Sequence, residues 1–134
     1  MTLRIAINGF GRIGRLVVRA VAEYGMKDVQ IVGINSPGAF DTQVHLLKYD
    51  TVHGRFPGTL QTGDGSIDFG AGPIRVTHER NPADIDWKSL DVDVVMECSG
   101  IFRSKEAVQG HLKAGAKQVL ISAPGQNVDK TIVY

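Results

Sequence analysis

A glycine-rich turn between a short apolar run and an amphipathic segment constrains this chain more than any other feature. It reads Gly9-Phe10-Gly11-Arg12-Ile13-Gly14, the pattern G-x-G-x-x-G. The first glycine permits a tight turn, the second lets the backbone approach a pyrophosphate, and the third lets a helix pack on a strand. The free N–H groups and dipole of that helix then hold phosphate oxygens. The turn therefore predicts a dinucleotide site, and a tightly packed turn without a ligand is the alternative.

Short β-branched runs alternate with helical patterns along the chain, which predicts βαβ units. We expect strands over residues 3–7, 30–34, 93–98 and 118–122, and helices from the glycine turn, over 41–49 and over 104–114. In the first helix an apolar stripe at helical spacing predicts the buried face, and Gly25 is expected to cap the helix in a left-handed conformation. The stripe comprises Ile13, Leu16, Val17, Ala20 and Val21.

Frequent glycine and proline between residues 54 and 73 indicate hairpins rather than helices. We therefore expect an α/β fold: a Rossmann, doubly wound, mostly parallel sheet with helices on both faces and a small antiparallel excursion between about residues 59 and 78. The apolar run over 131–134 is expected to be a strand, and a chain that stops there suggests part of a longer protein.

Composition narrows the class of protein. The chain has 134 residues, of which 43% are hydrophobic and 22% charged, as expected for one globular domain. Lys+Arg 15 against Asp+Glu 14 leaves a net charge of +1, which indicates neither a nucleic acid nor an anionic membrane as partner. No apolar run approaches the roughly 18 residues of a membrane span. A single cysteine, Cys98, excludes an intrachain disulfide and a Cys-based metal cluster. We expect a cytoplasmic protein.

The tip of the second expected strand bears on the choice of cofactor. A Rossmann unit usually places an acidic side chain there to bind the adenosine ribose, but this chain has Asn35 and Ser36. Loss of the carboxylate removes both the attraction for ribose hydroxyls and the repulsion of a 2′-phosphate. No Arg or Lys lies between Ser36 and Val44 to bind that phosphate. The predicted cofactor is NAD or NADP.

Further sequence blocks resemble the glyceraldehyde-3-phosphate dehydrogenase family, in its order and spacing over essentially the whole chain. They are residues 6–15 (AINGFGRIGR), 45–56 (HLLKYDTVHGRF), 79–82 (ERNP), 91–95 (DVDVV), 99–102 (SGIF), 111–117 (HLKAGAK) and 121–124 (ISAP). Erythrose-4-phosphate dehydrogenases share most of these blocks and are the nearest alternative family within the same superfamily. The resemblance implies an NAD(P)-binding domain over residues 1–134, with the family's catalytic domain absent from this chain.

The resemblance also implies individual roles. Backbone at Arg12 and Ile13 would hold the pyrophosphate, with Ile13 also beneath the nicotinamide. Asn35 and Arg80 would lie around the adenosine, and Ser122 near the nicotinamide. The family usually has Asp at the position of Ser36, so that contact does not transfer. The cofactor-binding residues predicted from the turn and the resemblance together are Gly9, Phe10, Gly11, Arg12, Ile13, Asn35, Ser36, Arg80, Ser99, Gly100, Phe102 and Ser122.

As a whole enzyme, the resemblance implies phosphorylating oxidation of an aldehyde through a thiohemiacetal, with hydride passed to nicotinamide, in glycolysis or gluconeogenesis. The family's catalytic cysteine and histidine are not in this chain, so we expect no catalytic residue and no activity from it alone. The implied partners are the dinucleotide, the missing catalytic domain and further copies of the chain. A free-standing nucleotide-binding module and a purely structural assembly piece are the alternatives.

The other reactive side chains have simpler interpretations. Cys98 ends an apolar run and is expected to be a buried hydrophobic residue rather than a nucleophile. The histidines lack metal-ligand spacing, and His111, beside Lys113 on a helix, is expected to be solvated. Four basic residues are expected to be surface or subunit-contact charges rather than a phosphate site: Lys48, Arg55, Arg103 and Lys105. Three acidic residues beside an expected helix around Trp87 are expected to be solvated and not paired as acid and base: Asp84, Asp86 and Asp91.

Overall fold

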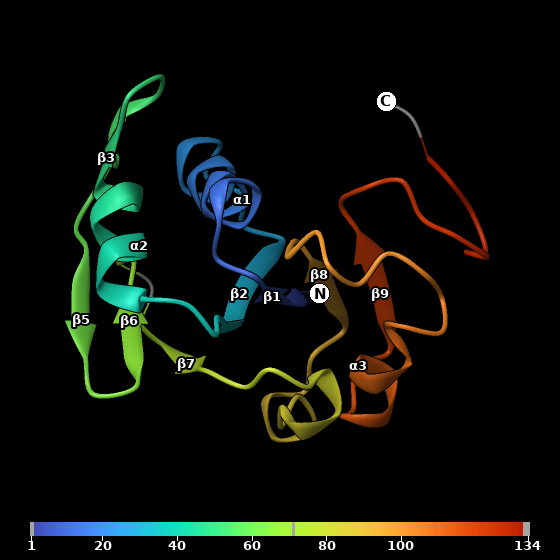
Figure 1. Ribbon diagram of the computed structural model, residues 1–134. Helices are drawn as coiled ribbons and strands as arrows, with labels where there is room; N and C mark the ends of the chain where they lie inside the picture. Colours follow the sequence, from blue (N-terminus) through green and yellow to red (C-terminus); the bar gives the residue numbers. More distant parts are fainter. Residues whose placement is uncertain (1, 71, 133–134) are drawn as a thin grey trace.

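A seven-stranded sheet forms the centre of the molecule. The computed structural model describes residues 2–70 and 72–132, and its sheet has the strand order β5-β6-β7-β2-β1-β8-β9 (Figure 1). Strand β1 (Leu3–Asn8) pairs in parallel with both β2 (Val29–Asn35) and β8 (Val94–Glu97). β7 (Pro73–Thr77) and β9 (Gln118–Ile121) continue the parallel part on either side. This order, with β1 central, is that of a doubly wound sheet and confirms the expected Rossmann fold.

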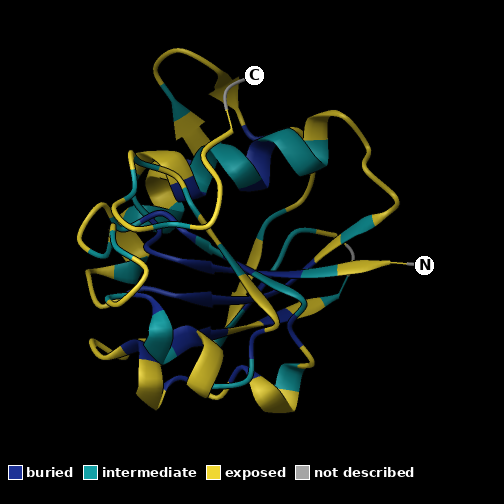
Figure 2. Cartoon of the chain, turned by 90° about the vertical axis from the view of Figure 1, so that its right-hand side faces the viewer, coloured by how far each residue is buried: buried dark blue, intermediate teal, exposed yellow. Residues whose placement is uncertain are grey.

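Helices cover both faces of the sheet. α1 (Arg12–Glu23) and α2 (Phe40–Lys48) lie on one face, and α3 (Gln109–Lys113) with the 3₁₀ turns η1 (Pro82–Asp84) and η2 (Lys88–Leu90) on the other (Figure 1). Alternate residues of β1 serve the two layers, since Ile7 packs with α1 and α2 and Ala6 with Trp87. The central strands are consequently buried between two apolar layers (Figure 2).

The buried face of α1 differs from the expected stripe. Gly14 and Val18 are buried, whereas Ile13 is 48% exposed. The reason is the third glycine: a Cβ at Gly14 would collide with the carbonyl oxygen of Gly9, so its absence lets the helix lie directly on the turn. That contact rotates the helix toward Gly14. Gly25, with φ +57°, follows the C-terminal end of α1 as expected.

The antiparallel excursion is present and ends inside the main sheet. β5 (Gln61–Gly63), β6 (Ser66–Asp68) and β7 form consecutive antiparallel pairs. β7 then joins β2 in parallel, with Gly33 opposite Arg75. A separate hairpin of β3 (Tyr49–Asp50) and β4 (Gly54–Arg55), which the sequence did not predict, follows α2.

Three expectations for the second half of the chain are wrong in detail. The helix expected over 104–114 is only α3, because Ser104 forms a bridge with Gln126 that holds this stretch against the later chain. The helix expected around Trp87 is two 3₁₀ turns, since Ile85 between them is extended and Asp91 has φ 50°. Residues 131–132 belong to no strand, and residues 133–134 lie outside the described residues.

Candidate functional site

The three glycines of the turn have three different environments. Gly9 has φ +93°, and a Cβ there would lie 2.6 Å from Ser99 Cα. Gly14 packs on Gly9, as described above. At Gly11, with φ −81°, a Cβ would meet no described atom within 4 Å apart from its chain neighbours. Gly11 is therefore the position at which the backbone faces open space, and a pyrophosphate could approach it closely.

The first turn of α1 opens toward that space. Its first helical hydrogen bond runs from Arg15 N to Gly11 O at 3.0 Å, so the N–H groups of Arg12 and Ile13 have no helical partner. Gly11 caps the helix without a side chain. Free N–H groups at a helix start, together with the helix dipole, are a general binding feature for phosphate oxygens.

The side chain of Arg12 is turned toward the β3–β4 hairpin. Its Nη1 lies 2.8 Å from Asp50 Oδ2. Hydrogen bonds from the N–H groups of His53 and Val52, together with Arg12, lower the pKa of Asp50 to about 2. This ion pair holds the start of α1 against the hairpin and leaves the backbone of the turn open.

Asn35, at the end of β2, uses its whole side-chain amide to join neighbouring strands. Its Nδ2 donates to Asn8 Oδ1 at 2.7 Å and to Glu79 O at 2.8 Å. Its Oδ1 accepts from Thr77 Oγ1 at 2.7 Å and from Glu79 N at 2.9 Å. The amide of Asn35 thus fixes the ends of β1, β2 and β7 relative to one another.

Ser36, at the place where a Rossmann unit usually has an acidic residue, is buried. Its hydroxyl donates to Gln43 Oε1 of α2 at 2.6 Å, and its carbonyl accepts from His78 Nδ1 at 2.8 Å. Arg80 is exposed, in the loop that follows β7. Ser36 therefore contributes no negative charge at the end of β2, and its side chain points toward α2.

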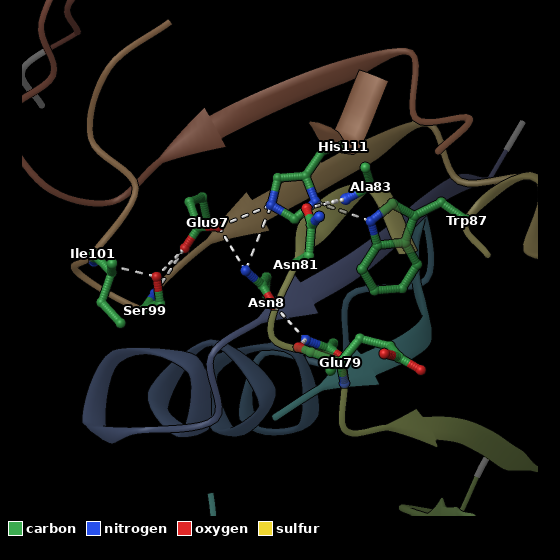
Figure 3. A network of polar contacts seen from close by, with 10 residues as sticks. Asn8, Glu79, Asn81, Ala83, Trp87, Glu97, Ser99, Ile101 and His111 are labelled. Atoms are coloured by element: carbon green, nitrogen blue, oxygen red, sulfur yellow. Dashed lines mark hydrogen bonds and ion pairs between the residues drawn. The ribbon is translucent and has the colours of Figure 1, made fainter. Parts of the chain in front are cut away.

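A buried polar network lies beneath the turn, and it corrects the expectation that His111 is solvated. His111 is 0% exposed, with Nε2 2.8 Å from Glu97 Oε1 and Nδ1 accepting from Trp87 Nε1 at 3.0 Å (Figure 3). His111 lies on α3, which packs closely against η1. A Cβ added at Gly110 of α3 would lie only 2.9 Å from Ala83 N of η1, so the missing side chain of Gly110 allows this close packing.

Glu97 is ionised in this network. Burial raises its pKa, but hydrogen bonds from His111, Ser99 and Asn8 together lower the pKa further than burial raises it. Asn8 Nδ2 donates at 2.6 Å to Oε1, and Ser99 donates through N at 3.0 Å and through Oγ at 2.5 Å to Oε2. A buried carboxylate held by several donors is stable in its charged form.

The sequence pattern did not indicate that four residues form one cluster: Asn8, Glu97, Trp87 and His111. The available signal was that Asn8 and Glu97 are polar residues at the ends of apolar strands, where neighbouring parallel strands bring their side chains together. His111 gave no such signal, because its burial depends on how α3 packs against η1.

The remaining predicted residues lie near the same edge of the sheet. Gly100, with φ +76°, is exposed, and Phe102 is partly buried in the loop after β8. Ser122 follows β9 and its N–H donates to Glu97 O at 3.1 Å. Cys98 is 8% exposed, and burial raises the pKa of its thiol, as suits the expected apolar role. The turn, Asn35, Ser36, Ser99 and Ser122 thus share the carboxyl edge.

Two of the clefts formed by the described residues lie away from the glycine turn. One of about 560 Å³ lies at the opposite edge of the sheet, among residues such as Val21, Met26 and Ile74. One of about 310 Å³ lies between Phe40 of α2 and His78. In the described part of the chain, His, Cys, Asp and Glu form no group of three that could hold a metal ion. Residues 2–70 and 72–132 also contain no helix suited in length and apolarity to crossing a membrane.

A glycine-rich turn between the first strand and the first helix of a doubly wound sheet is characteristic of dinucleotide-binding domains. Residues 3–105 match the sequence family described as glyceraldehyde 3-phosphate dehydrogenase, NAD binding domain, and the chain belongs to that family.

The chain is 55% identical over 134 residues to the glyceraldehyde-3-phosphate dehydrogenase of Cereibacter sphaeroides and 52% identical to that of Xanthobacter flavus. It is 49% identical over 135 residues to the glyceraldehyde-3-phosphate dehydrogenase of Pseudomonas aeruginosa. Each match covers 100% of this chain and 40% of the relative, so the chain spans about 40% of the length of these curated relatives.

Proposed function

We propose that residues 1–134 form the cofactor-binding domain of a phosphorylating glyceraldehyde-3-phosphate dehydrogenase. The observation that carries this proposal is the open space at Gly11 in front of the free N–H groups of α1. The names of the relatives support glyceraldehyde 3-phosphate over erythrose 4-phosphate as the substrate of the whole protein. Its catalytic cysteine and histidine would come from a second domain, with assembly into a homo-oligomer in the cytoplasm.

In this proposal the backbone N–H groups of Arg12 and Ile13 hold the pyrophosphate. Ser99, Gly100 and Phe102 line the adenine and ribose side, since they follow β8 next to the turn. Arg80 contacts the adenosine half and Ser122 the nicotinamide half. NAD bound here supplies the acceptor for a hydride, while this chain orients it. We propose that the chain alone turns over no substrate, because the nucleophile and the base would belong to the second domain.

A single substitution separates ligand binding from folding. Gly11→Ala places a methyl group where it touches no described protein atom, so the stability cost is that of a less favourable helix cap, about 1 kcal/mol or less. The same methyl group would occupy the approach of the pyrophosphate. We expect NAD affinity, measured by calorimetric titration, to fall at least about tenfold, which corresponds to about 1.4 kcal/mol.

The matched control is Tyr24→Ala, at an exposed residue beyond the other end of α1, which should leave NAD affinity unchanged. Absence of heat and of a thermal upshift for the wild-type chain at millimolar NAD would contradict the proposal. Equal affinity in Gly11→Ala and the wild type would place the pyrophosphate elsewhere.

We also propose that the site accepts NADP. Ser36 brings no charge to the end of β2 and directs its hydroxyl to Gln43, so nothing at this position repels a 2′-phosphate. Ser36→Asp should shift the preference toward NAD, and Ser36→Asn, of the same shape but uncharged, should shift it much less. Titration of each variant with both cofactors decides the matter. A wild-type preference for NAD above about a hundredfold that Ser36→Asp leaves unchanged contradicts this account.

A further inference from the structure

Glu97 is a buried carboxylate, 1% exposed, whose hydrogen-bonding neighbours all act as donors. Asn8 Nδ2 donates to Oε1, which His111 Nε2 also contacts, and both the N–H and the hydroxyl of Ser99 donate to Oε2. A glutamine here would have to turn its NH₂ group, which can only donate, toward the donors that now face Oε1 or toward those that face Oε2. The arrangement therefore requires a carboxylate and not only a polar side chain of the same shape.

Trp87 determines which nitrogen of His111 faces that carboxylate. An indole N–H can only donate, so His111 Nδ1, 3.0 Å away, must accept. The ring proton therefore lies on Nε2 and is donated to Glu97 Oε1 at 2.8 Å. With the imidazole neutral in this arrangement, the charge of Glu97 is compensated by hydrogen bonds.

Two partners of Glu97 connect it to the glycine turn. Asn8 directly precedes Gly9, and its Oδ1 accepts from Asn35 Nδ2 at 2.7 Å. Ser99 lies so close beneath Gly9 that a Cβ there would come within 2.6 Å of Ser99 Cα. One carboxylate thus joins the ends of β1, β2 and β8, which carry the loops of the proposed cofactor site (Figure 3).

We propose that Glu97, oriented by His111 and Trp87, is a positioning residue for the dinucleotide. It fixes the spacing between the glycine turn and the loop after β8 without touching the ligand. Glu97 and His111 are 1% and 0% exposed, so their effect on affinity passes through Asn8 and Ser99. This inference rests on the proposed NAD binding and adds residues that the glycine pattern does not contain.

The test compares Glu97→Gln with Met96→Leu, a volume-conserving change at the preceding, partly buried residue of β8. Calorimetric titration of each folded chain with NAD and with ADP-ribose should show at least tenfold weaker binding to Glu97→Gln and less than a twofold change for Met96→Leu. Binding by Glu97→Gln within twofold of the wild type, or an equal loss in both variants, overturns the inference.

A second measurement needs no ligand and so separates this inference from the proposed function. Amide exchange at Gly9, whose N–H donates to Asn35 O, and at Ser99, whose N–H donates to Glu97, should be at least tenfold faster in Glu97→Gln than in Met96→Leu. Unchanged rates overturn the positioning role, whereas a wild-type chain that fails to bind NAD contradicts only the proposed function.

If Glu97→Gln does not fold, Trp87→Phe takes its place, because it keeps an aromatic ring in the core and removes the indole N–H that orients His111. We expect at least threefold faster exchange at Ser99 than in Met96→Leu. Equal rates in these two variants overturn the inference.

Discussion

Glu97 has a very different environment in the folded and the unfolded chain, because it is a charged group that is 1% exposed in the fold. Unfolding replaces donors from Asn8, Ser99 and His111 with water. Removing a partner from such a buried charge costs more than the bond itself is worth, because the charge is then left unsatisfied. The folded state accordingly depends on the protonation of this one carboxyl group.

Acid should therefore weaken the fold through Glu97. Because the folded state lowers its pKa below the ordinary 4.5, its contribution is complete above that value and is lost as the pH falls through the lower, folded pKa. Urea unfolding at pH 7 and at about pH 3 should show a smaller fall in stability for Glu97→Gln than for the wild type. Identical pH dependence in the two chains would contradict the assignment. The other carboxylates with lowered pKa, such as Asp50 and Asp93, are common to both and cancel in the comparison.

At the scale of elements, α1 is fastened to the segment of α2, β3 and β4 by a buried arginine. Arg19, 2% exposed, donates through Nη2 to Leu47 O at 2.5 Å and to Gly54 O at 2.7 Å. Its guanidinium carbon lies 5.9 Å from the ring centroid of Phe56. This one side chain thus satisfies carbonyl groups at the end of α2 and in the hairpin.

Arg19→Met keeps the apolar stem and removes these donors. The carbonyl oxygens of Leu47 and Gly54 would then lose a charged partner, so we expect destabilisation of roughly 2 to 4 kcal/mol by urea unfolding. Arg75→Met, at an exposed residue with one long contact to Ser89, should change stability by less than about 0.5 kcal/mol. An equally small effect at Arg19 would mean that water replaces its donors.

Local pattern predicted the parallel strands and α1 well, because β-branched runs and the glycine turn are properties of neighbouring residues. The prediction that Ile13 lies on the buried face of α1 was wrong. The orientation of the helix depends on the contact between Gly14 and Gly9 as well as on apolar spacing. The burial of His111 could not be predicted for a similar reason: its partners Trp87 and Glu97 lie 24 and 14 residues away in sequence. Placement by distant partners is not visible in local spacing.

In the whole molecule, the cleft of about 560 Å³ is lined by residues of α1, β2 and β7, of which Val18, Ile31 and Ile74 are buried. Met26, which lines the cleft, is 47% exposed. Tyr24, two residues earlier in the chain, is 78% exposed. Exposed apolar side chains such as these two favour association. We propose that a second copy of the 134-residue chain covers this cleft.

Sedimentation at several concentrations tests self-association. We expect dimers or larger species to form by about 100 μM, well above a micromolar dissociation constant. Val21→Glu, on the wall of the cleft, should shift the chain toward monomer, whereas Tyr49→Glu, on the distant hairpin, should not. A single monomeric species over the whole range would contradict the proposal.

The contact between Gly9 and Ser99 also bears on how the chain is synthesised. β1 can pair with β2 as soon as residue 35 has left the ribosome, but its other edge waits for β8, about 90 residues later than β1 itself. Closing so long a loop is slow compared with forming a local pair. The glycine turn therefore reaches its final packing only after a segment about 90 residues further along the chain has been made, and the proposed cofactor site is incomplete until then.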